Sequence, residues 1–470
     1  MSVVTKVVII GGGPGGYEAA LVASQLGGDV TLVERDGLGG AAVLTDCVPS
    51  KTLIATAEVM STMERAADLG LHFRGDDVAG AIRVDMSELN TRVLDLAHAQ
   101  SDDIEARLRH EGVNVVRGGA VLEGADTVMV TTVDKVEQFD ADIILLATGT
   151  TPRELPEARC DGERILNWKQ LYTLEAIPQR LIVVGSGVTG AEFASAYDAL
   201  GGDVVLVSSR QQVLPGEDQD AANVLQRAFT NRGMEIISEA RAESARVEGD
   251  EVVVGLTDGR EVRGSHCLMA VGSTPNTAGL GLEEVGVTLT PSGHILADRV
   301  SRTSVRTIYA AGDVTGVFPL ASVAAMQGRI AMWHALGDAV SPLDLRKVSS
   351  NVFTSPEIAT VGTTQKQVDS GEVRVASVLL PLASNARAKM QGFTDGFVKL
   401  FCLPTTGIIV GGVVVAPNAS ELIHSVAVCV GQRVTVDEFS GSFTVYPSMT
   451  GSLAEAARRL HTTGGAFLTS

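Results

Sequence analysis

The chain has 470 residues, of which 45% are hydrophobic, so it is long enough for about three domains with large buried cores. Its formal net charge is −19, and its isoelectric point is about 4.9. Because nucleic acids and anionic membrane surfaces are bound through basic patches, this charge argues against both as partners, and we interpret it as a contribution to solubility.

No segment of the sequence predicts a signal peptide, a membrane span or a metal site. Residues 1–6 lead directly into an apolar strand, which is not the pattern of a secretory signal. No run of ~18 apolar residues occurs, so we expect no transmembrane helix. The five cysteines have no CxxC spacing, which indicates neither a disulfide framework nor a zinc site. They are Cys47, Cys160, Cys267, Cys402 and Cys429. The cytoplasm is the expected compartment.

A glycine-rich turn joins the first predicted strand, Lys6–Ile10, to the first predicted helix, Tyr17–Leu26. Gly11, Gly13 and Gly16 match the GxGxxG pattern between them. The first glycine makes the turn, the second lets a pyrophosphate approach the backbone, and the third allows the helix to pack closely. The N-terminus of the helix then faces the phosphates.

The second predicted strand, Val30–Val33, ends in an acid, Glu34. A carboxylate at this position can accept hydrogen bonds from a ribose hydroxyl pair. A GxGxxG pattern alone is also found in ordinary glycine-rich turns, but the full order of strand, glycines, helix, strand and acid predicts dinucleotide binding.

The segments that follow are predicted to be structural, with apolar residues at helical or alternating spacing. They are helices Thr52–Leu69 and Met86–Glu111, strand Val113–Arg117, a β-meander over Ala120–Phe139, and strand Ile143–Ala147, which leads into Thr148 and Gly149.

The same order of elements recurs in the middle of the chain. Strand Arg180–Val184, helix Ala191–Leu200 and strand Val204–Val207 surround a second glycine turn. Its glycines are Gly185, Gly187 and Gly190. Two such units predict two dinucleotides, most simply a bound flavin and a nicotinamide donor.

The second unit ends in Ser208 where the first unit has an acid, and Ser209 and Arg210 follow. An acid there would repel the 2′-phosphate of NADPH, whereas hydroxyls and an arginine could bind it. Arg210 could equally be an exposed loop cation. NADPH is therefore a possible donor, and NADH is not excluded.

The pattern of predicted strands and helices changes in the last third of the sequence. One further strand is predicted to end at Gly272. Another is predicted over Ser304–Ala311, directly before Gly312 and Asp313. After about Leu345 the pattern indicates a separate α+β domain. Its predicted elements are strands Phe397–Phe401 and Ile408–Val415 and helices Ser420–Val430 and Ser452–Leu460.

The segment Gly39–Lys51, with Cys47 before a Pro-Ser-Lys, resembles the redox-disulfide loop of the flavoprotein disulfide reductases, such as lipoamide dehydrogenase and glutathione reductase. Further matching motifs occur in the family's order at Val8–Ala20, Leu145–Pro152, Val183–Ala194, Ala270–Thr277, Tyr309–Asp313 and Ser355–Gly362. The resemblance covers essentially the whole chain.

The resemblance implies an α/β fold with two Rossmann-like dinucleotide-binding domains and a C-terminal α+β dimerisation domain. The implied domains are an FAD-binding part at 1–150 with a helical insert at 52–111, an NAD(P)-binding domain at 151–274, a second FAD-binding or central part at 275–345, and a dimerisation domain at 346–470. A homodimer would follow.

The resemblance also implies site residues for FAD and for NADPH or NADH. Lys51 would lie beside the flavin ring, Glu192 would pair with it near the nicotinamide, and Tyr446 would act from the partner chain. The implied cofactor-binding residues are Gly11, Gly13, Pro14, Gly16, Glu34, Gly40, Lys51, Thr148, Gly149, Gly185, Gly187, Gly190, Ser208, Arg210, Gly272, Gly312, Asp313 and Ala321.

Two departures from the family pattern bear on the reaction. Ala42 stands where the family has the first redox cysteine, so Cys47 cannot cycle as half of that disulfide. Tyr446 stands where the family has a histidine before proline, and Gly451 takes the place of the histidine's glutamate. A phenol is a poor base near neutral pH. The redox disulfide and the histidine base that acts with it in the family are therefore both absent from this sequence.

These departures predict an enzyme that reduces its flavin with NAD(P)H and passes electrons to a flat acceptor such as a quinone. In this respect the chain resembles the actinobacterial members of the family that reduce quinones. A soluble pyridine-nucleotide transhydrogenase is the alternative, and lipoamide or glutathione reduction is disfavoured without a cysteine at Ala42. A redox-silent flavin-bearing subunit would have no need for the second nucleotide turn.

Overall fold

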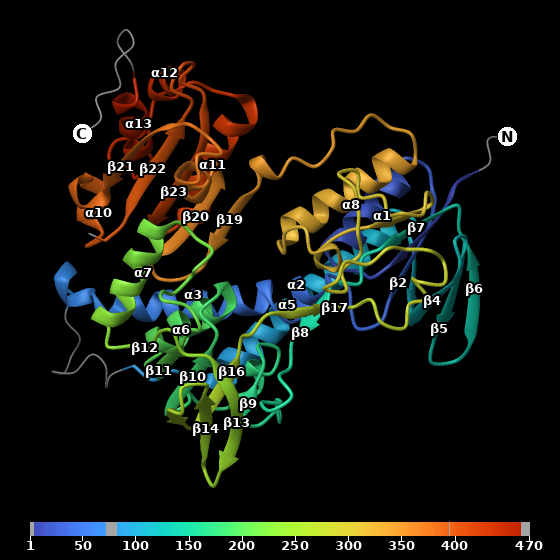
Figure 1. Ribbon diagram of the computed structural model, residues 1–470, viewed down its shortest axis with the longest axis horizontal. Coiled ribbons are helices and arrows are strands. Elements are labelled where there is room, and N and C mark those ends of the chain that lie inside the picture. The colour runs from blue at the N-terminus through green and yellow to red at the C-terminus, as the bar shows by residue number, and fades with distance from the viewer. Residues whose placement is uncertain (1–3, 72–81, 394, 462–470) are drawn as a thin grey trace. The chain divides into compact units, whose positions relative to one another are not determined.

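The computed structural model describes residues 4–71, 82–393 and 395–461 (Figure 1). The chain forms two compact units. The first comprises Met1–Thr52, Glu88–Arg153 and Gly272–Asp344, and the second Leu53–Ser87, Glu154–Val271 and Leu345–Ser470. The breaks after Arg153, Val271 and Asp344 lie near three of the predicted domain limits, and the functional division into four parts stays a prediction.

A parallel five-stranded sheet forms the centre of the first unit. Its strands, in spatial order, are β18 (Ile308–Ala310), β7 (Ile143–Leu146), β1 (Lys6–Ile10), β2 (Asp29–Glu34) and β3 (Asn114–Arg117). Helices α1 (Pro14–Gln25) and α8 (Ala321–Ala335) lie side by side against it (Figure 1). Gly328 allows this close approach, because a Cβ on it would lie 2.0 Å from the carbonyl oxygen of Gly15.

Alternation along β1 explains why both faces of this sheet are covered. Val7 and Ile9 belong to the apolar cluster that includes α1 and α8. Val8 and Ile10 belong to the cluster that includes the antiparallel meander β4 (Gly119–Gly124), β5 (Thr127–Thr131) and β6 (Val136–Asp140). A fully apolar strand is thus buried on both sides, as parallel strands usually are.

A second parallel sheet lies in the second unit, with a three-stranded antiparallel sheet against it. The parallel strands, in spatial order, are β12 (Glu235–Ile237), β11 (Asp203–Val207), β10 (Arg180–Val184), β16 (His266–Met269) and β9 (Ile165–Leu166). The antiparallel strands are β13 (Ala242–Glu248), β14 (Glu251–Leu256) and β15 (Glu261–Gly264). Helix α6 (Val188–Ala199) follows β10, and α7 (Gln219–Asn231) precedes β12.

The C-terminal part of the second unit is built on an antiparallel sheet. Its strands, in spatial order, are β19 (Ser349–Val352), β20 (Glu357–Gly362), β23 (Ile409–Ala416), β22 (Phe397–Cys402) and β21 (Ala376–Pro381). Helices α11 (Ala419–Gln432) and α13 (Thr450–Arg459) share its apolar cluster.

The remaining described elements are short or join these sheets. The helices are α2 (Gly40–Leu44), α3 (Cys47–Glu64), α5 (Met86–His110), α9 (Gln365–Asp369), α10 (Ala386–Met390) and α12 (Val436–Ser440). The single-turn 3-10 helices are η1 (Ala66–Leu69), η2 (Leu171–Thr173), η3 (Asp313–Thr315), η4 (Leu345–Lys347) and η5 (Leu382–Ser384). Strands β8 (Thr150–Pro152) and β17 (Ser273–Pro275) pair antiparallel. Within the described ranges, no helix has the length and hydrophobicity needed to cross a membrane.

The predicted α/β class is confirmed, with two glycine-turn units and a C-terminal α+β region. The predicted strand Ser304–Ala311 is wrong at its start, because only Ile308–Ala310 are in a strand. A turn precedes it, in which Thr303 Oγ1 donates to the carbonyl oxygen of Ile308 at 2.8 Å. The first helix begins earlier than predicted, at Pro14, since proline suits the first turn of a helix.

Candidate functional site

The first glycine turn leaves space where a nucleotide phosphate would approach. Gly11 has a φ of +104°, and a Cβ on it would lie 2.3 Å from the carbonyl oxygen of Ala147. A Cβ on Gly16 would lie 1.8 Å from the carbonyl oxygen of Gly11, so only glycine fits. Gly13 is different, because a Cβ there would meet no heavy atom within 4 Å. The turn is therefore tight on its protein side and open at the N-terminus of α1, which begins at Pro14.

The carboxylate of Glu34, at the end of β2, organises this turn. Its Oε2 accepts the backbone N–H of Gly12 at 2.6 Å, and its Oε1 accepts that of Asp36 at 2.7 Å. The backbone N–H of Gly37 also lies 3.3 Å from Oε1. Glu34 is buried. It thus holds the glycine turn against the end of the strand, in addition to the predicted contact with a ribose.

Further predicted cofactor residues of the first unit meet near the ends of β7 and β18. Thr148 Oγ1 donates to the carbonyl oxygen of Asn276 at 2.8 Å, and Asn276 Nδ2 donates to the carbonyl oxygen of Thr148 at 2.8 Å. The backbone N–H of Asn276 donates to the carbonyl oxygen of Gly149 at 3.0 Å. Asn276 therefore clamps the Thr148–Gly149 turn.

Asp313 begins η3 directly after Gly312, which has a φ of +83°. Burial, followed by the nearby Asp46 carboxylate, raises the pKa of Asp313. Thr150 Oγ1 lies at hydrogen-bond distance, 3.5 Å, from Asp313 Oδ2. The backbone N–H of Gly312 donates to Oε1 of the buried Gln327 at 2.8 Å. The predicted residues Gly272 and Ala321 lie before β17 and at the start of α8.

The segment Gly39–Lys51 lies against the first glycine turn. The backbone N–H of Gly39 donates to the carbonyl oxygen of Gly12 at 2.9 Å. Gly40 has a φ of +55°, and a Cβ on it would lie 2.8 Å from the Cα of Gly13. Ala42 lies in α2, while Cys47 and Lys51 lie in the first turns of α3, and all three are half-buried.

Burial disfavours the thiolate form of the other four cysteines. Burial raises the pKa of Cys160 and of Cys402 to about 11. Burial also raises the pKa of Cys267 and of Cys429. Because the thiolate is the nucleophile in disulfide chemistry, none of these four is suited to take the role of the missing cysteine at Ala42.

The second glycine turn repeats the geometry of the first. A Cβ on Gly185, whose φ is +112°, would lie 2.2 Å from the carbonyl oxygen of Ala270. A Cβ on Gly190 would lie 1.8 Å from the carbonyl oxygen of Gly185. Gly187, like Gly13, has no heavy atom within 4 Å of such a Cβ. The chain therefore contains two turns that are closed at the first and third glycine and open at the second.

Ser208 takes a structural role at the end of β11. It is fully buried, and its Oγ lies 2.7 Å from Ser186 Oγ, in the glycine turn. The backbone N–H of Arg210 donates to Ser208 Oγ at 3.1 Å. Ser209 and Arg210 are exposed. A hydroxyl pair thus replaces the carboxylate–backbone link of the first turn. The exposed edge carries the cation Arg210, and the backbone N–H of the exposed Glu239 donates to the carbonyl oxygen of Arg210 at 3.0 Å.

Glu192 lies in α6 and is buried, with 4% of its surface exposed. The backbone N–H of Phe353 donates to its Oε1 at 2.9 Å. One turn along the helix, Ser195 Oγ accepts the backbone N–H of Ser355 at 3.0 Å. Glu192 thus fixes the segment between β19 and β20. It lies in the second unit and Lys51 in the first, so their predicted pairing stays a prediction.

Tyr446 lies on an exposed segment between α12 and α13. It is 86% exposed, and Val445 beside it is 78% exposed. Phe443 is exposed as well. Large apolar side chains in solvent are unusual for a monomer and are typical of a protein–protein contact. The predicted action of Tyr446 from a partner chain is compatible with this exposure.

Three side chains that the sequence pattern did not single out hold the predicted site together. They are Ser186, Asn276 and Gln327, each bonded to a predicted cofactor residue or its backbone. Ser186 and Asn276 lie inside the motifs GSG and STPN, so their position could have marked them. Gln327 lies in an apolar helix, where a buried polar side chain requires a partner.

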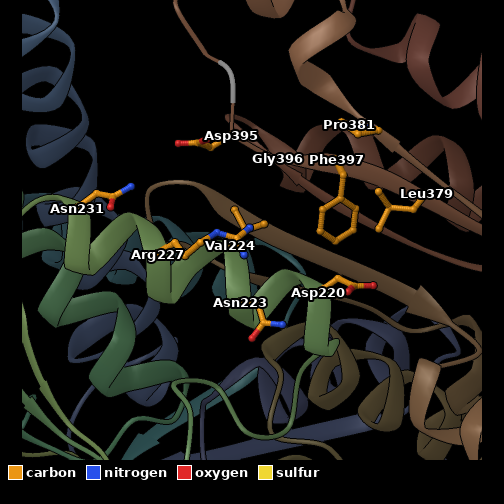
Figure 2. A pocket seen from close by; sticks show the side chains of 10 residues that line it. All are labelled: Asp220, Asn223, Val224, Arg227, Asn231, Leu379, Pro381, Asp395, Gly396 and Phe397. Carbon is orange, nitrogen blue, oxygen red and sulfur yellow. The ribbon is translucent and has the colours of Figure 1, made fainter.

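A separate cavity of about 330 Å³ lies between α7 and strands β21 and β22 (Figure 2). It is lined by Asp220, Asn223, Val224, Arg227, Asn231, Leu379, Pro381, Asp395, Gly396 and Phe397. None of the predicted site residues lines this cavity.

Two family models match the chain. Residues 5–328 match the pyridine nucleotide-disulphide oxidoreductase model, and residues 348–457 match the dimerisation domain of the same group. An "NAD(P)H dehydrogenase (quinone)" from Mycobacterium tuberculosis strain H37Rv is 53% identical over 467 residues, which cover 97% of this chain and 94% of that protein. A dihydrolipoyl dehydrogenase from Geobacillus stearothermophilus is 30% identical, with coverage of 96% and 95%.

Solved structures show the same fold. The crystal structure of LpdA from Mycobacterium tuberculosis superposes with a TM-score of 0.93 at 52% identity, and covers 98% of this chain and 100% of its own. The flavoprotein disulfide reductase RclA from Escherichia coli superposes with a TM-score of 0.85 at 24% identity, and covers 96% and 99%.

Proposed function

Since this chain belongs to the pyridine nucleotide-disulphide oxidoreductase family, we propose that it is an FAD-dependent NAD(P)H:quinone oxidoreductase. One observation carries the proposal. Ala42 removes the first redox cysteine, while both nucleotide-binding turns keep their glycine geometry. The residues expected for reduction of the flavin by NAD(P)H are therefore present, whereas the disulfide that accepts the electrons in other family members cannot form. The relative that is 53% identical is named for quinone reduction, which supports the same acceptor class.

The first unit fits FAD. The open space at Gly13 admits a pyrophosphate at the N-terminus of α1, whose first turn contains no acidic residue to repel it. Glu34 would receive the adenosine ribose, and Asp313 the ribityl chain. When bound, a flavin accepts a hydride from a nicotinamide and passes electrons to an acceptor. Lys51 would hold a positive charge beside the ring and favour its reduced, anionic form.

The second unit fits a nicotinamide dinucleotide. The open space at Gly187 admits its pyrophosphate at the N-terminus of α6. Ser209 and Arg210 are exposed at the end of β11, so a 2′-phosphate would meet a hydroxyl and a cation where the first unit has the acid Glu34. NADPH and NADH are both donors in this proposal. Glu192 would lie near the nicotinamide, with its orientation held by the N–H of Phe353.

The acceptor side is completed by a second copy of the chain. The match to a dimerisation domain supports a homodimer, in which Tyr446 of one subunit faces the flavin site of the other. The small side chain of Ala42 leaves room for a flat quinone, and the phenol of Tyr446 would donate a hydrogen bond to its oxygen. We further propose that the enzyme acts in the cytoplasm.

The test is anaerobic stopped-flow absorbance of the flavin-loaded protein. Mixing with NADPH or NADH is expected to bleach the flavin, and a second mixing with menadione is expected to restore its absorbance. Oxidised lipoamide is expected to leave the flavin reduced. The Cys47→Ser variant is expected to reduce menadione as the wild type does. Reoxidation of the wild-type flavin by lipoamide, if it were lost in Cys47→Ser, would overturn the proposal.

The same protein separates quinone reduction from transhydrogenation. NADPH with thio-NAD⁺ in place of menadione measures hydride transfer between two nucleotides at the second turn. Steady-state turnover of thio-NAD⁺ above that of menadione would favour a transhydrogenase. We expect the opposite order, because the relative that is 53% identical is named for quinone reduction. Ala42 by itself fits both reactions, since neither of them needs a redox disulfide.

A further inference from the structure

A buried ammonium group connects the C-terminal sheet to helix α7. Lys399, in the middle of β22, has 4% of its surface exposed. Its Nζ lies 2.8 Å from Asp218 Oδ2, 2.6 Å from Asp220 Oδ2 and 3.3 Å from Gln365 Oε1. These three acceptors match the three donors of an ammonium group. A lysine this deeply buried requires such pairing, because an unpaired charge in the interior is very costly.

The surroundings of Lys399 leave its ammonium group little room to move. Nζ lies 5.8 Å from the ring centroid of Phe397 and 5.9 Å from that of Phe401. Figure 2 shows Asp220 in the first turn of α7 and Phe397 on the strand that faces it. Aromatic rings at this distance attract a cation. The position of Nζ is therefore defined on the sheet side as well as on the helix side.

Asp218 uses its two carboxylate oxygens for two different tasks. Oδ2 binds Lys399, and Oδ1 accepts the backbone N–H groups of Asp220 at 3.0 Å and Ala221 at 3.2 Å. Asp218 is thus the N-cap of α7, in an arrangement that satisfies donors the helix itself cannot. Because the cap is bonded to Lys399, the position of the first turn of α7 depends on β22.

The residues directly before Asp218, Ser208–Glu217, connect the end of β11 to α7. We call this segment the coenzyme loop, because it contains the proposed coenzyme residue Arg210. Its first residue, Ser208, is bonded to Ser186 in the second glycine turn. Further along, the backbone N–H of Leu214 donates to the carbonyl oxygen of Ser186 at 2.8 Å. The backbone N–H of Glu217 then donates to the carbonyl oxygen of Leu214 at 3.1 Å. The loop is therefore held to the glycine turn at Ser208 and Leu214 and to Lys399 through Asp218. It is also bonded to α7 itself, because the backbone N–H of Val213 donates to Gln226 Oε1 at 3.2 Å.

We propose that Lys399 is a positioning residue for the nicotinamide coenzyme, which acts through Asp218 on the coenzyme loop. The inference rests on the proposed coenzyme site at Gly187 and Arg210. Arg210 lies in the exposed part of the loop, between the attachments of Ser208 and Leu214 to the glycine turn, and the backbone N–H of Glu239 donates to its carbonyl oxygen at 3.0 Å. Without the bond between Lys399 and Asp218, the first turn of α7 and the part of the loop bonded to α7 through Val213 sample more conformations, and the coenzyme must order them on binding. Loss of pre-organisation weakens binding without removing a contact to the ligand.

The test compares Lys399→Met/Asp218→Asn with the wild-type, flavin-loaded protein. The double variant removes both charges, so no buried carboxylate is left unpaired at Asp218, and asparagine still caps a helix. Lys389→Met, on the exposed face of α10, is the matched control. Isothermal titration with NADP⁺ and with NAD⁺ measures coenzyme affinity directly, flavin absorbance measures FAD content, and thermal unfolding measures stability.

We expect the Kd of both nucleotides to rise about tenfold in the double variant and to stay unchanged in Lys389→Met. The KM for NADPH rises with it, whereas FAD content and the KM for menadione stay at the wild-type values. An unchanged Kd, with or without a lower Tm, would overturn the inference and leave Lys399 with a role in stability only. Wild-type protein that binds coenzyme but does not reduce menadione would overturn the proposed function alone.

Discussion

The two glycines Gly187 and Gly190 are expected to respond in opposite ways to the same substitution. A Cβ on Gly187 meets no heavy atom within 4 Å, and its φ of −74° suits alanine. A Cβ on Gly190 would lie 1.8 Å from the carbonyl oxygen of Gly185. We therefore expect Gly187→Ala to fold as the wild type does and to bind coenzyme weakly. Gly190→Ala is expected to lose stability as well.

The size of the effect follows from what the added methyl group displaces. In Gly187→Ala it occupies the open space at the N-terminus of α6, so the pyrophosphate can no longer reach a backbone N–H. A hydrogen bond to a charged group contributes about 1.5–3 kcal/mol, which corresponds to about ten- to one-hundredfold in Kd. In Gly190→Ala the methyl group must separate α6 from the turn, and overpacking of this kind costs about 1–3 kcal/mol or more of unfolding free energy.

The assay is isothermal titration of the flavin-loaded variants with NADP⁺, together with their thermal unfolding. Gly13→Ala is the matched control, because Gly13 is the equivalent open position in the first turn. It is expected to weaken FAD retention and leave the coenzyme Kd of any flavin-loaded molecules unchanged. An unchanged Kd in Gly187→Ala would refute the reasoning, since the open space would then not be the coenzyme site.

Three further outcomes are expected. Lys51→Ala slows reduction of the flavin by NADPH in stopped-flow absorbance while FAD stays bound; unchanged reduction would remove Lys51 from the flavin site. Tyr446→Phe slows reoxidation by menadione more than flavin reduction and leaves the Tm unchanged, since the side chain is 86% exposed; equal slowing of both steps would contradict its assignment. Burial raises the pKa of Asp198 to about 6, although Arg232 Nε lies 3.1 Å away. The folded state therefore holds this proton more tightly than the unfolded chain, and the free energy of unfolding falls as the pH rises from about 4 through about 6. Asp198→Asn is expected to reduce this fall in urea unfolding at pH 5 and pH 7.5, and an identical pH dependence would show that Asp198 is not its source.

The geometry of the Gly39–Lys51 segment explains how the proposed enzyme can keep the reduction of its flavin by NAD(P)H while its electron acceptor changes. Gly39 and Gly40 contact the first glycine turn, so the start of the Gly39–Lys51 segment is fixed by the turn that we propose binds FAD. Ala42 follows in the five-residue helix α2, and Cys47 is the first residue of the 18-residue helix α3. A substitution at Ala42 is therefore expected to alter the acceptor side of the proposed site without altering the glycine turn that is proposed to hold FAD.

The two glycine turns could be predicted from the sequence because their requirements are local. Gly16 must avoid the carbonyl oxygen of Gly11, and Gly190 that of Gly185, so strand, turn and helix together demand glycine at fixed spacing. The alternation of Val7 to Ile10 between two apolar clusters likewise follows from the period of a strand. Local sterics and periodicity thus determined the fold class and both candidate nucleotide sites.

Only the tertiary structure decided which side chains hold these sites in place. Asn276 binds Thr148 across 128 positions, and Lys399 binds Asp218 across 181 positions. No periodicity connects residues so far apart, because their contacts depend on how distant segments come together. For Asn276 and Thr148 these are the segments after β17 and β7, and for Lys399 and Asp218 they are β22 and the start of α7. For the same reason the sequence assigned Ser208 to the coenzyme, whereas the fold buries its hydroxyl against Ser186. The sequence by itself determined where two dinucleotides can approach the backbone, and the packing of distant elements decided which charges and hydroxyls are left to meet them.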